Sequence, residues 1–168
     1  MKSLIIYYSH IGENYFVSGI TNITKGNTQK VAEFIKQITN SDIFEIQPVK
    51  EYSSNYKECC KQAKKELDNK IYPQLKEYIK DISKYDVIYI GGPIWYGTYP
   101  MAVYSLIKEL DFSNKIIKPF STHEGSGLGN IINDLSLYCK NSIIKPGLSI
   151  QGSYISEYKD KIKEWTLK

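Results

Sequence analysis

Apolar residues gather in five short runs along the chain, and each run is typical of a strand buried on both faces of a parallel sheet. The fifth run is interrupted by Pro146-Gly147, which predicts a bent or bulged strand. The expected strands are Ser3–Tyr8, Asp42–Ile46, Tyr85–Ile90, Lys115–Phe120, and Ile143–Ile144 together with Leu148–Ile150.

The segments between these runs place apolar residues at helical spacing. Tyr56–Ile82 predicts one helix followed by a shorter one, with Pro73 at the break or in a first turn. Gly12–Lys25 lacks this spacing and is expected to be a long polar loop. The other expected helices are Thr28–Ile38, Pro100–Leu110, Leu128–Cys139 and Ser156–Trp165.

Strands that alternate with helices predict an α/β fold with a parallel sheet and right-handed crossovers. We expect a single domain over residues 1–168, because no linker or fixed repeat divides the chain. The expected architecture is a doubly wound, five-stranded, three-layer sandwich of strand order 2-1-3-4-5. In that order the ligand crevice opens between strands one and three, at their carboxyl ends.

Charge and cysteine content narrow the function classes. Lysine supplies all 22 basic residues, and the absence of arginine argues against specific nucleic-acid recognition. No apolar run approaches the roughly 20 residues of a membrane span. The three cysteines, Cys59, Cys60 and Cys139, form no disulfide framework. We therefore expect free structural thiols, a cytoplasmic location and no membrane contact.

The most informative stretch is Val87–Gly97, an apolar run that passes abruptly into Gly91-Gly92-Pro93. We expect this tripeptide to end the strand, because proline cannot donate to a central ladder. Trp95 and Tyr96 then follow at the carboxyl end of a buried strand, where open α/β sheets bind ligands. They are placed to stack on a conjugated ring, and the alternative is that they pack under the following helix.

Two other loops lie at the same sheet edge. Lys25-Gly26-Asn27-Thr28 opens the first expected helix, whose N-terminus suits a phosphate, unless Asn27 or Thr28 only caps it. It matches neither a Walker loop nor a dinucleotide fingerprint. Thr122–Gly127 follows the fourth strand and offers backbone amides to a carbonyl-rich ring edge, unless it is only a turn and cap.

Both histidines of the chain, His10 and His123, directly follow strands at this edge. Only Glu124 is evident as a further metal ligand, so no metal is expected. A phosphate cradle, an aromatic loop and an amide-rich loop around one crevice are together satisfied by a phosphorylated conjugated ring. The sequence therefore predicts flavin mononucleotide (FMN) as the cofactor.

The chain resembles the flavodoxin family, specifically its short group with Gly-Glu-Asn-Tyr after the first strand. The resemblance rests on Tyr8–Tyr15, Lys25–Thr28, Gly92–Gly97 and Thr122–Gly127. It implies a flavodoxin-like sandwich that binds FMN. Two features depart from the family pattern. Gly12–Thr24 interrupts the compact phosphate turn, and the chain is net basic where many family members are strongly acidic.

The resemblance also assigns roles to residues. Ser9, His10, Asn27 and Thr28 would hold the phosphate, Pro93–Gly97 would line the isoalloxazine ring, and Thr122–Gly127 would meet its remaining edge. The predicted cofactor-binding residues are Ser9, His10, Asn14, Lys25, Gly26, Asn27, Thr28, Pro93, Ile94, Trp95, Tyr96, Gly97, Thr122, His123, Glu124, Gly125, Ser126 and Gly127.

Two functions follow from a bound flavin, and the sequence favours the first. A non-catalytic carrier would pass low-potential electrons between redox partner proteins, using a carbonyl of Gly91–Gly97 that accepts a bond from reduced N5. An oxidoreductase would instead move a hydride from NAD(P)H to a quinone or nitroaromatic, as a monomer or at a homodimer interface. A flavin-free signalling domain of the receiver type would need an acidic cluster at the end of the first strand and a phosphorylatable aspartate after the third strand. This chain has neither, which argues against that function.

Overall fold

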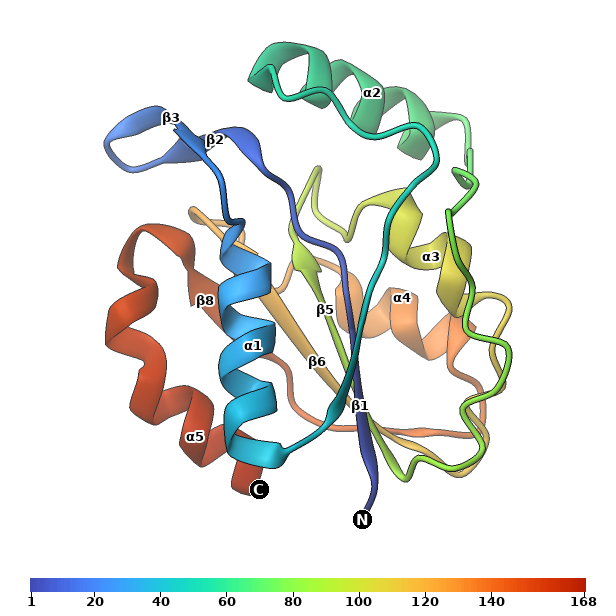
Figure 1. Cartoon of the computed structure of the whole chain (residues 1–168). Coiled ribbons are helices and arrows are strands. Elements are labelled where there is room, and N and C mark those ends of the chain that lie inside the picture. Colours follow the sequence, from blue (N-terminus) through green and yellow to red (C-terminus); the bar gives the residue numbers. More distant parts are fainter.

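The computed structural model describes residues 1–168 and is built on a parallel sheet of order β4-β1-β5-β6, with β7 and β8 both paired to the outer edge of β6 (Figure 1). This order confirms the predicted 2-1-3-4-5 arrangement, with the fifth strand divided in two. The strands are β1 (Ser3–Tyr7), β4 (Asp42–Glu45), β5 (Val87–Pro93), β6 (Ile116–His123), β7 (Ile143–Ile144) and β8 (Leu148–Gln151).

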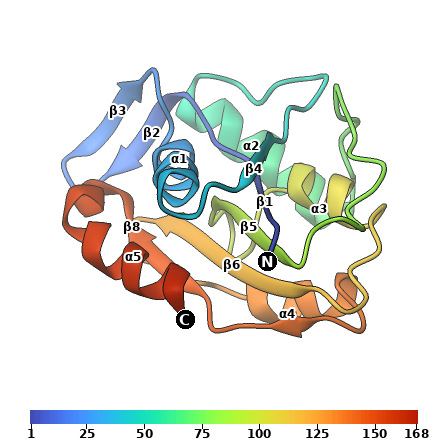
Figure 2. The same cartoon turned by 60° about the horizontal axis from the view of Figure 1, so that its bottom comes forward.

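Helices cover both faces of the sheet, as the alternating pattern predicts (Figure 2). Neighbouring residues Ile5 and Ile6 of β1 point to opposite faces and belong to two separate buried clusters. One cluster includes α1 and α5, and the other includes α3 and α4. The helices are α1 (Asn27–Thr39), α2 (Tyr56–Asp68), α3 (Met101–Ile107), α4 (Ile131–Tyr138), the 3-10 helix η1 (Gly152–Tyr158) and α5 (Lys159–Leu167).

The expected polar loop after β1 is instead an antiparallel hairpin of β2 (Gly12–Phe16) and β3 (Gly19–Ile23). Its amide–carbonyl ladder satisfies the backbone of a segment that lacks helical spacing. The hairpin lies at the carboxyl end of the sheet, beside the start of α1 (Figure 1).

The prediction that Gly91-Gly92-Pro93 ends the strand is wrong, because β5 continues to Pro93, which pairs with Thr122. A Cβ on Gly91 would lie 2.0 Å from the Phe120 ring. Glycine at this position therefore leaves room for the Phe120 side chain, which lies over β5. Proline is tolerated at the last position because β1 pairs with β5 only as far as Gly91. Beyond Gly91 one edge of β5 has no neighbouring strand, so the missing N–H of proline breaks no hydrogen bond there.

The shorter helix expected after Pro73 is absent, and the segment runs as an irregular strap. Its backbone pairs with residues 47–49, where Val49 donates to Gln74 and Lys76 donates to Gln47, each at 2.8 Å. Leu75 is buried in the larger core cluster, and this long-range packing outweighs local helix propensity. None of the helices combines the length and the apolar composition that a membrane span needs.

Candidate functional site

A cavity of about 370 Å³ opens at the carboxyl ends of β1, β5 and β6, at the switch point where the sequence places the ligand. It combines polar, aromatic and small side chains. Its walls are His10, Glu13, Asn14, Tyr15, Asn27, Thr28, Tyr56, Cys59, Cys60, Ala63, Pro93, Ile94, Trp95, Tyr96, Thr122, His123, Glu124, Gly125, Ser126 and Gly152.

One end of the cavity is the N-terminus of α1. Gly26 is the N-cap, and neither Asn27 nor Thr28 caps the helix with its side chain. The Ser9 hydroxyl accepts a hydrogen bond from the Gln29 amide at 3.0 Å. The amides of Asn27 and Thr28 precede it and have no partner within the helix, so they are available to an anion.

Gly26 is required by this geometry. A Cβ there would lie 2.1 Å from Ser9 Oγ and 2.6 Å from the His10 carbonyl oxygen. Ser9 and Gly26 therefore shape the helix terminus without lining the cavity themselves.

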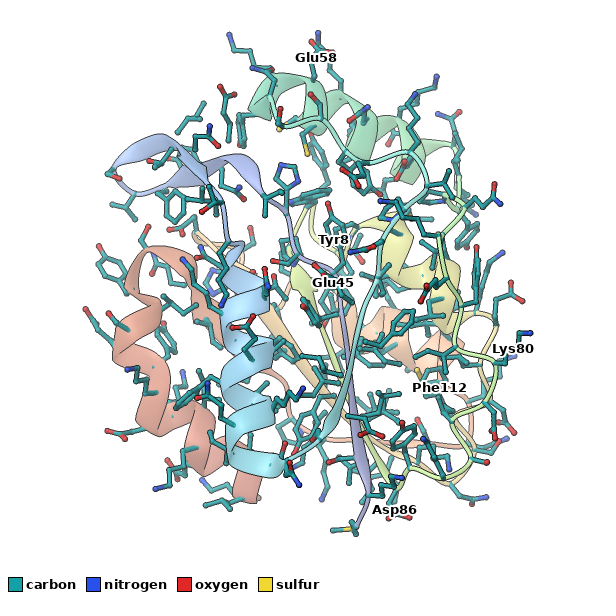
Figure 3. All side chains as sticks on the ribbon, viewed as in Figure 1. Tyr8, Glu45, Glu58, Lys80, Asp86 and Phe112 are labelled. Atoms are coloured by element: carbon teal, nitrogen blue, oxygen red, sulfur yellow. The ribbon has the colours of Figure 1, made fainter.

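His10 lies beside this terminus and is only 8% exposed. Its Nε2 is the buried side-chain polar atom that finds no hydrogen-bond partner in the protein. The ring packs edge to face against Trp95, with centroids 5.4 Å apart, and Nδ1 lies 3.4 Å from the hydroxyl of Tyr8, below α2 in Figure 3. Burial lowers the His10 pKa. The cavity is thus lined both by a histidine whose buried Nε2 lacks a partner and by the free amides of the α1 N-terminus, groups that can hydrogen-bond phosphate oxygens.

The aromatic loop after β5 is a tight turn over Trp95–Thr98. The amide of Trp95 donates to the Thr98 carbonyl at 2.8 Å, and the Thr98 amide donates back at 3.3 Å. Tyr96 and Gly97 both have positive φ, 52° and 83°, as a type I′ turn requires. Trp95 also packs edge to face on Tyr52 at 5.0 Å, so it both lines the cavity and anchors in the core.

The peptide between Tyr96 and Gly97 is the free one in this turn. Neither its carbonyl nor its N–H is hydrogen-bonded, whereas the Gly97 carbonyl accepts from the Asn130 amide at 2.7 Å. The turn is therefore fixed at its ends by backbone bonds. At its tip the Tyr96 hydroxyl donates to the Cys60 carbonyl at 3.2 Å, but the Tyr96–Gly97 peptide itself has no hydrogen bond.

The third loop joins the first across the cavity floor. The Thr122 and Thr28 hydroxyls are hydrogen-bonded at 2.8 Å. His123 Nδ1 accepts from the Gly125 amide at 2.9 Å, so a neutral His123 carries its proton on Nε2. Burial lowers the His123 pKa, and Glu124 only partly opposes this. The imidazole is therefore a neutral donor.

Glu124 is already engaged within the protein. Its carboxylate accepts from the amide of Ser153 at 2.8 Å and from the Ser153 hydroxyl at 2.7 Å, which ties the loop to η1. Ser121 donates to the Gly127 carbonyl at 2.8 Å, so Gly127 supports the loop from outside the cavity.

The sequence reasoning missed the wall that α2 provides, and from β2 it predicted only Asn14. The α2 residues of this wall are Tyr56, Cys59, Cys60 and Ala63, which follow i, i+3, i+4, i+7 spacing that the dense charge of the helix obscured. The missed cavity residues are Glu13, Tyr15, Tyr56, Cys59, Cys60, Ala63 and Gly152.

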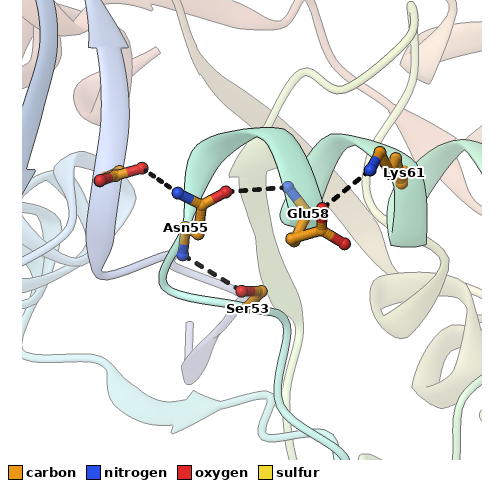
Figure 4. A network of polar contacts seen from close by, with 5 residues as sticks. Ser53, Asn55, Glu58 and Lys61 are labelled. Atoms are coloured by element: carbon orange, nitrogen blue, oxygen red, sulfur yellow. Dashed lines mark hydrogen bonds and ion pairs between the residues drawn. The ribbon is translucent and has the colours of Figure 1, made fainter.

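Glu13 and Asn55 hold this wall in place. The Glu13 carboxylate accepts from the Tyr56 amide at 2.8 Å and from the Asn55 side chain at 2.9 Å. Asn55 also caps α2 by accepting from the Glu58 amide at 3.2 Å (Figure 4). Asn14 Nδ2 donates to the Gly12 carbonyl at 3.2 Å and lies on the β2 side of the cavity.

The structure thus brings the predicted residues together at one cavity, apart from Ser9, Lys25, Gly26, Gly97 and Gly127. Lys25 is exposed and forms an ion pair with Glu33 of α1. Cys59, Cys60 and Cys139 are free thiols, and no cluster of three metal-ligating side chains is present.

The doubly wound sheet and the cavity at its switch point define a flavodoxin-like α/β protein. A family model described as Flavodoxin matches residues 15–168. The chain therefore belongs to the flavodoxin family.

Solved structures agree with this assignment. A candidate flavoprotein from Bacteroides uniformis is 25% identical, with a TM-score of 0.76 over 99% of this chain and 98% of that one. A flavoprotein in complex with FMN from Lactobacillus acidophilus is 21% identical, with a TM-score of 0.66 over 94% and 97%. Oxidised flavodoxin 2 from Bacillus cereus is 16% identical, with a TM-score of 0.57 over 99% and 96%. Among curated proteins, none matches the sequence.

Proposed function

We propose that this flavodoxin acts as a single domain that binds FMN and carries electrons between redox partner proteins. Family membership and the FMN complex of the similar Lactobacillus acidophilus flavoprotein support this cofactor. The unpaired Nε2 of His10 and the free amides of α1, which line the same cavity, support a site for a phosphate.

In this proposal the phosphate is held by the amides of Asn27 and Thr28, the Thr28 hydroxyl and His10. Burial lowers the His10 pKa, so the free protein holds a neutral ring at this position. Both ring nitrogens of the ionised form are donors, and an incoming phosphate dianion would favour that form.

The ring end of the site offers an aromatic wall and a polar edge. Trp95 and Tyr96 present apolar faces, and the loop after β6 offers the backbone amides of Glu124 and Ser126 together with the Nε2–H of His123. Flat heteroaromatic rings with carbonyl groups are recognised by this combination of stacking and donors.

One observation supports the carrier function above all, namely the free peptide between Tyr96 and Gly97. FMN, when bound, accepts electrons one or two at a time with accompanying protons. A peptide with no internal hydrogen bond to break, next to a glycine with positive φ, reorients at low cost. The Tyr96 carbonyl is thereby free to accept a hydrogen bond from a ring nitrogen of the flavin that carries a proton. Such a bond would separate the potentials of the two one-electron steps.

A second candidate function, NAD(P)H-dependent reduction of quinones or nitroaromatics, is favoured by the mouth of the cavity. Tyr15 and Tyr96 line it and are 53% and 51% exposed, so they offer ring faces to a second flat molecule. This function requires hydride transfer and a substrate position above the flavin, whereas the carrier requires only an accessible ring edge.

An anaerobic redox titration of the FMN-loaded protein separates the two functions. The carrier predicts two well-separated one-electron potentials and negligible NAD(P)H oxidation with quinone. A single two-electron step with rapid NAD(P)H turnover would instead establish the oxidoreductase.

Two glycine variants test the role of the free peptide. Gly97→Ala should narrow the separation of the potentials, because alanine resists positive φ. Gly19→Ala is the matched control. Gly19 has a φ of 111° and Gly97 a φ of 83°, and a Cβ would meet open space at both positions. Because Gly19 lies in the β2–β3 hairpin, the Gly19→Ala variant should leave the potentials unchanged. Equal separations in Gly97→Ala and wild type would refute the peptide's role.

A further inference from the structure

We propose that Asp134 of α4 is a positioning residue for the flavin, acting on the Trp95–Thr98 turn through the hydroxyl of Thr98, which it shares with Tyr104 of α3. This inference rests on the proposed function, because it assigns the turn's geometry to the flavin site. Asp134 itself does not line the cavity.

The three side chains form a hydrogen-bonded cluster. Thr98 Oγ1 donates to Asp134 Oδ2 at 2.6 Å, and the Tyr104 hydroxyl donates to the same carboxylate oxygen at 3.2 Å. The two hydroxyls also lie 2.6 Å apart, and the carboxylate, which only accepts, is the shared acceptor of the cluster. Thr98 and Tyr104 are buried, which makes a lost acceptor costly.

This chain fixes the turn at the residue that closes it. Thr98 supplies the amide and the carbonyl that pair with Trp95, so holding its side chain holds both ends of the turn. The first turn of α4 and the residues before it provide a second anchor, because the Asn130 amide donates to the Gly97 carbonyl. Gly129 permits this approach, since a Cβ there would lie 2.3 Å from the Gly97 oxygen.

Together the two anchors from α4 and its N-terminus immobilise the turn except for the Tyr96–Gly97 peptide. Removing the Asp134 acceptor takes away one of the two partners of the Thr98 hydroxyl and so loosens the turn at Thr98, while the Tyr104 hydroxyl and the Asn130 amide still contact it. The consequence is a looser aromatic wall and a flavin environment that no longer favours one orientation of the free peptide.

The test compares Asp134→Ala, Asp134→Asn and the matched control Asn133→Ala, an exposed neighbour on the same helix. Asp134→Ala should weaken FMN binding about tenfold, the equivalent of one net hydrogen bond, and should shift the one-electron potentials. Asp134→Asn keeps an acceptor for Thr98 and should restore both quantities. Asn133→Ala should change neither. Thr98→Val, which removes the donor, should reproduce Asp134→Ala.

Amide hydrogen exchange of Thr98 in the FMN-free protein gives a readout that needs no flavin. Asp134→Ala should accelerate it, and Asp134→Asn should not. The inference is overturned if Asp134→Ala lowers thermal stability alone, with exchange, affinity and potentials unchanged, or if Asp134→Asn behaves like Asp134→Ala. Failure of the wild-type protein to bind FMN would overturn the proposed function separately, and the exchange measurement would still decide the turn's anchoring.

Discussion

The hydroxyls of Thr28 and Thr122 are hydrogen-bonded at 2.8 Å, which joins the first turn of α1 to the end of β6 across the floor of the cavity. Both side chains are buried. The phosphate end and the ring end of the proposed flavin site thus share one structural link, although the two residues are far apart in the sequence.

Breaking this link should destabilise the protein even without flavin. Thr122→Val leaves the buried Thr28 hydroxyl without its partner, at a cost of about 1–3 kcal/mol in the free energy of unfolding. The double variant Thr28→Val/Thr122→Val should cost less than the sum of the two single variants, because no polar group is left unpaired. Urea unfolding of the FMN-free proteins measures this coupling, and strictly additive costs would contradict it.

Substitution of His10 should show whether this residue binds the phosphate of FMN or its ring. His10→Leu removes the unpaired Nε2 and should weaken FMN binding about tenfold while leaving riboflavin, which lacks the phosphate, unaffected. His123→Leu is the matched control, because its imidazole lies at the ring end and should matter equally for both ligands. Fluorescence titrations supply the dissociation constants. Equal losses for FMN and riboflavin in His10→Leu would place His10 away from the phosphate.

Acid should destabilise the flavin-free protein because burial lowers the pKa of both His10 and His123 below 6.5. As pH falls through about 6.5, the unfolded chain takes up protons before the folded one, so the free energy of unfolding decreases. Urea unfolding between about pH 7.5 and 5.5 should show this loss, with a shallower dependence in His10→Leu. A free energy of unfolding that rises as the pH falls over this range would contradict the lowered pKa values of the two histidines.

Trp95→Ala should weaken FMN binding about tenfold or more, because it removes the aromatic wall from the cavity. Trp165→Ala provides the comparison, since Trp165 packs on Tyr89 and Phe120 away from the cavity. Both variants should lose roughly 3 kcal/mol of stability. Unchanged FMN affinity and potentials in Trp95→Ala would assign Trp95 to core packing alone.

The parts of the fold that local pattern controls were predictable from the sequence. The alternation of Ile5 and Ile6 between two faces and the helical face of Val31, Ala32 and Ile35 follow from periodicity. The strand order follows instead from the alternation of strands and helices, which is typical of doubly wound sheets. The continuation of β5 through Pro93 was not predictable, because it depends on Phe120 passing over Gly91. The strap at Leu75 likewise forms through pairing with distant residues.

The cavity residues likewise fall into a predictable and an unpredictable part. Residues in loops that follow buried strands, such as His10, Trp95 and Thr122, are predicted from their position in the sequence. The wall from α2 is not, because the placement of Tyr56 and Cys60 over the cavity depends on a long-range hydrogen bond to Glu13. The Asp134 anchor is equally invisible in sequence, since nothing local links it to Thr98.

Titration of the flavin-free protein with FMN shows directly whether the cavity at the switch point binds this cofactor. We expect each chain to bind one FMN, with quenched flavin fluorescence, a yellow protein and affinity well above that for FAD. Protein that remains colourless and leaves FMN fluorescence unchanged at millimolar flavin would contradict it.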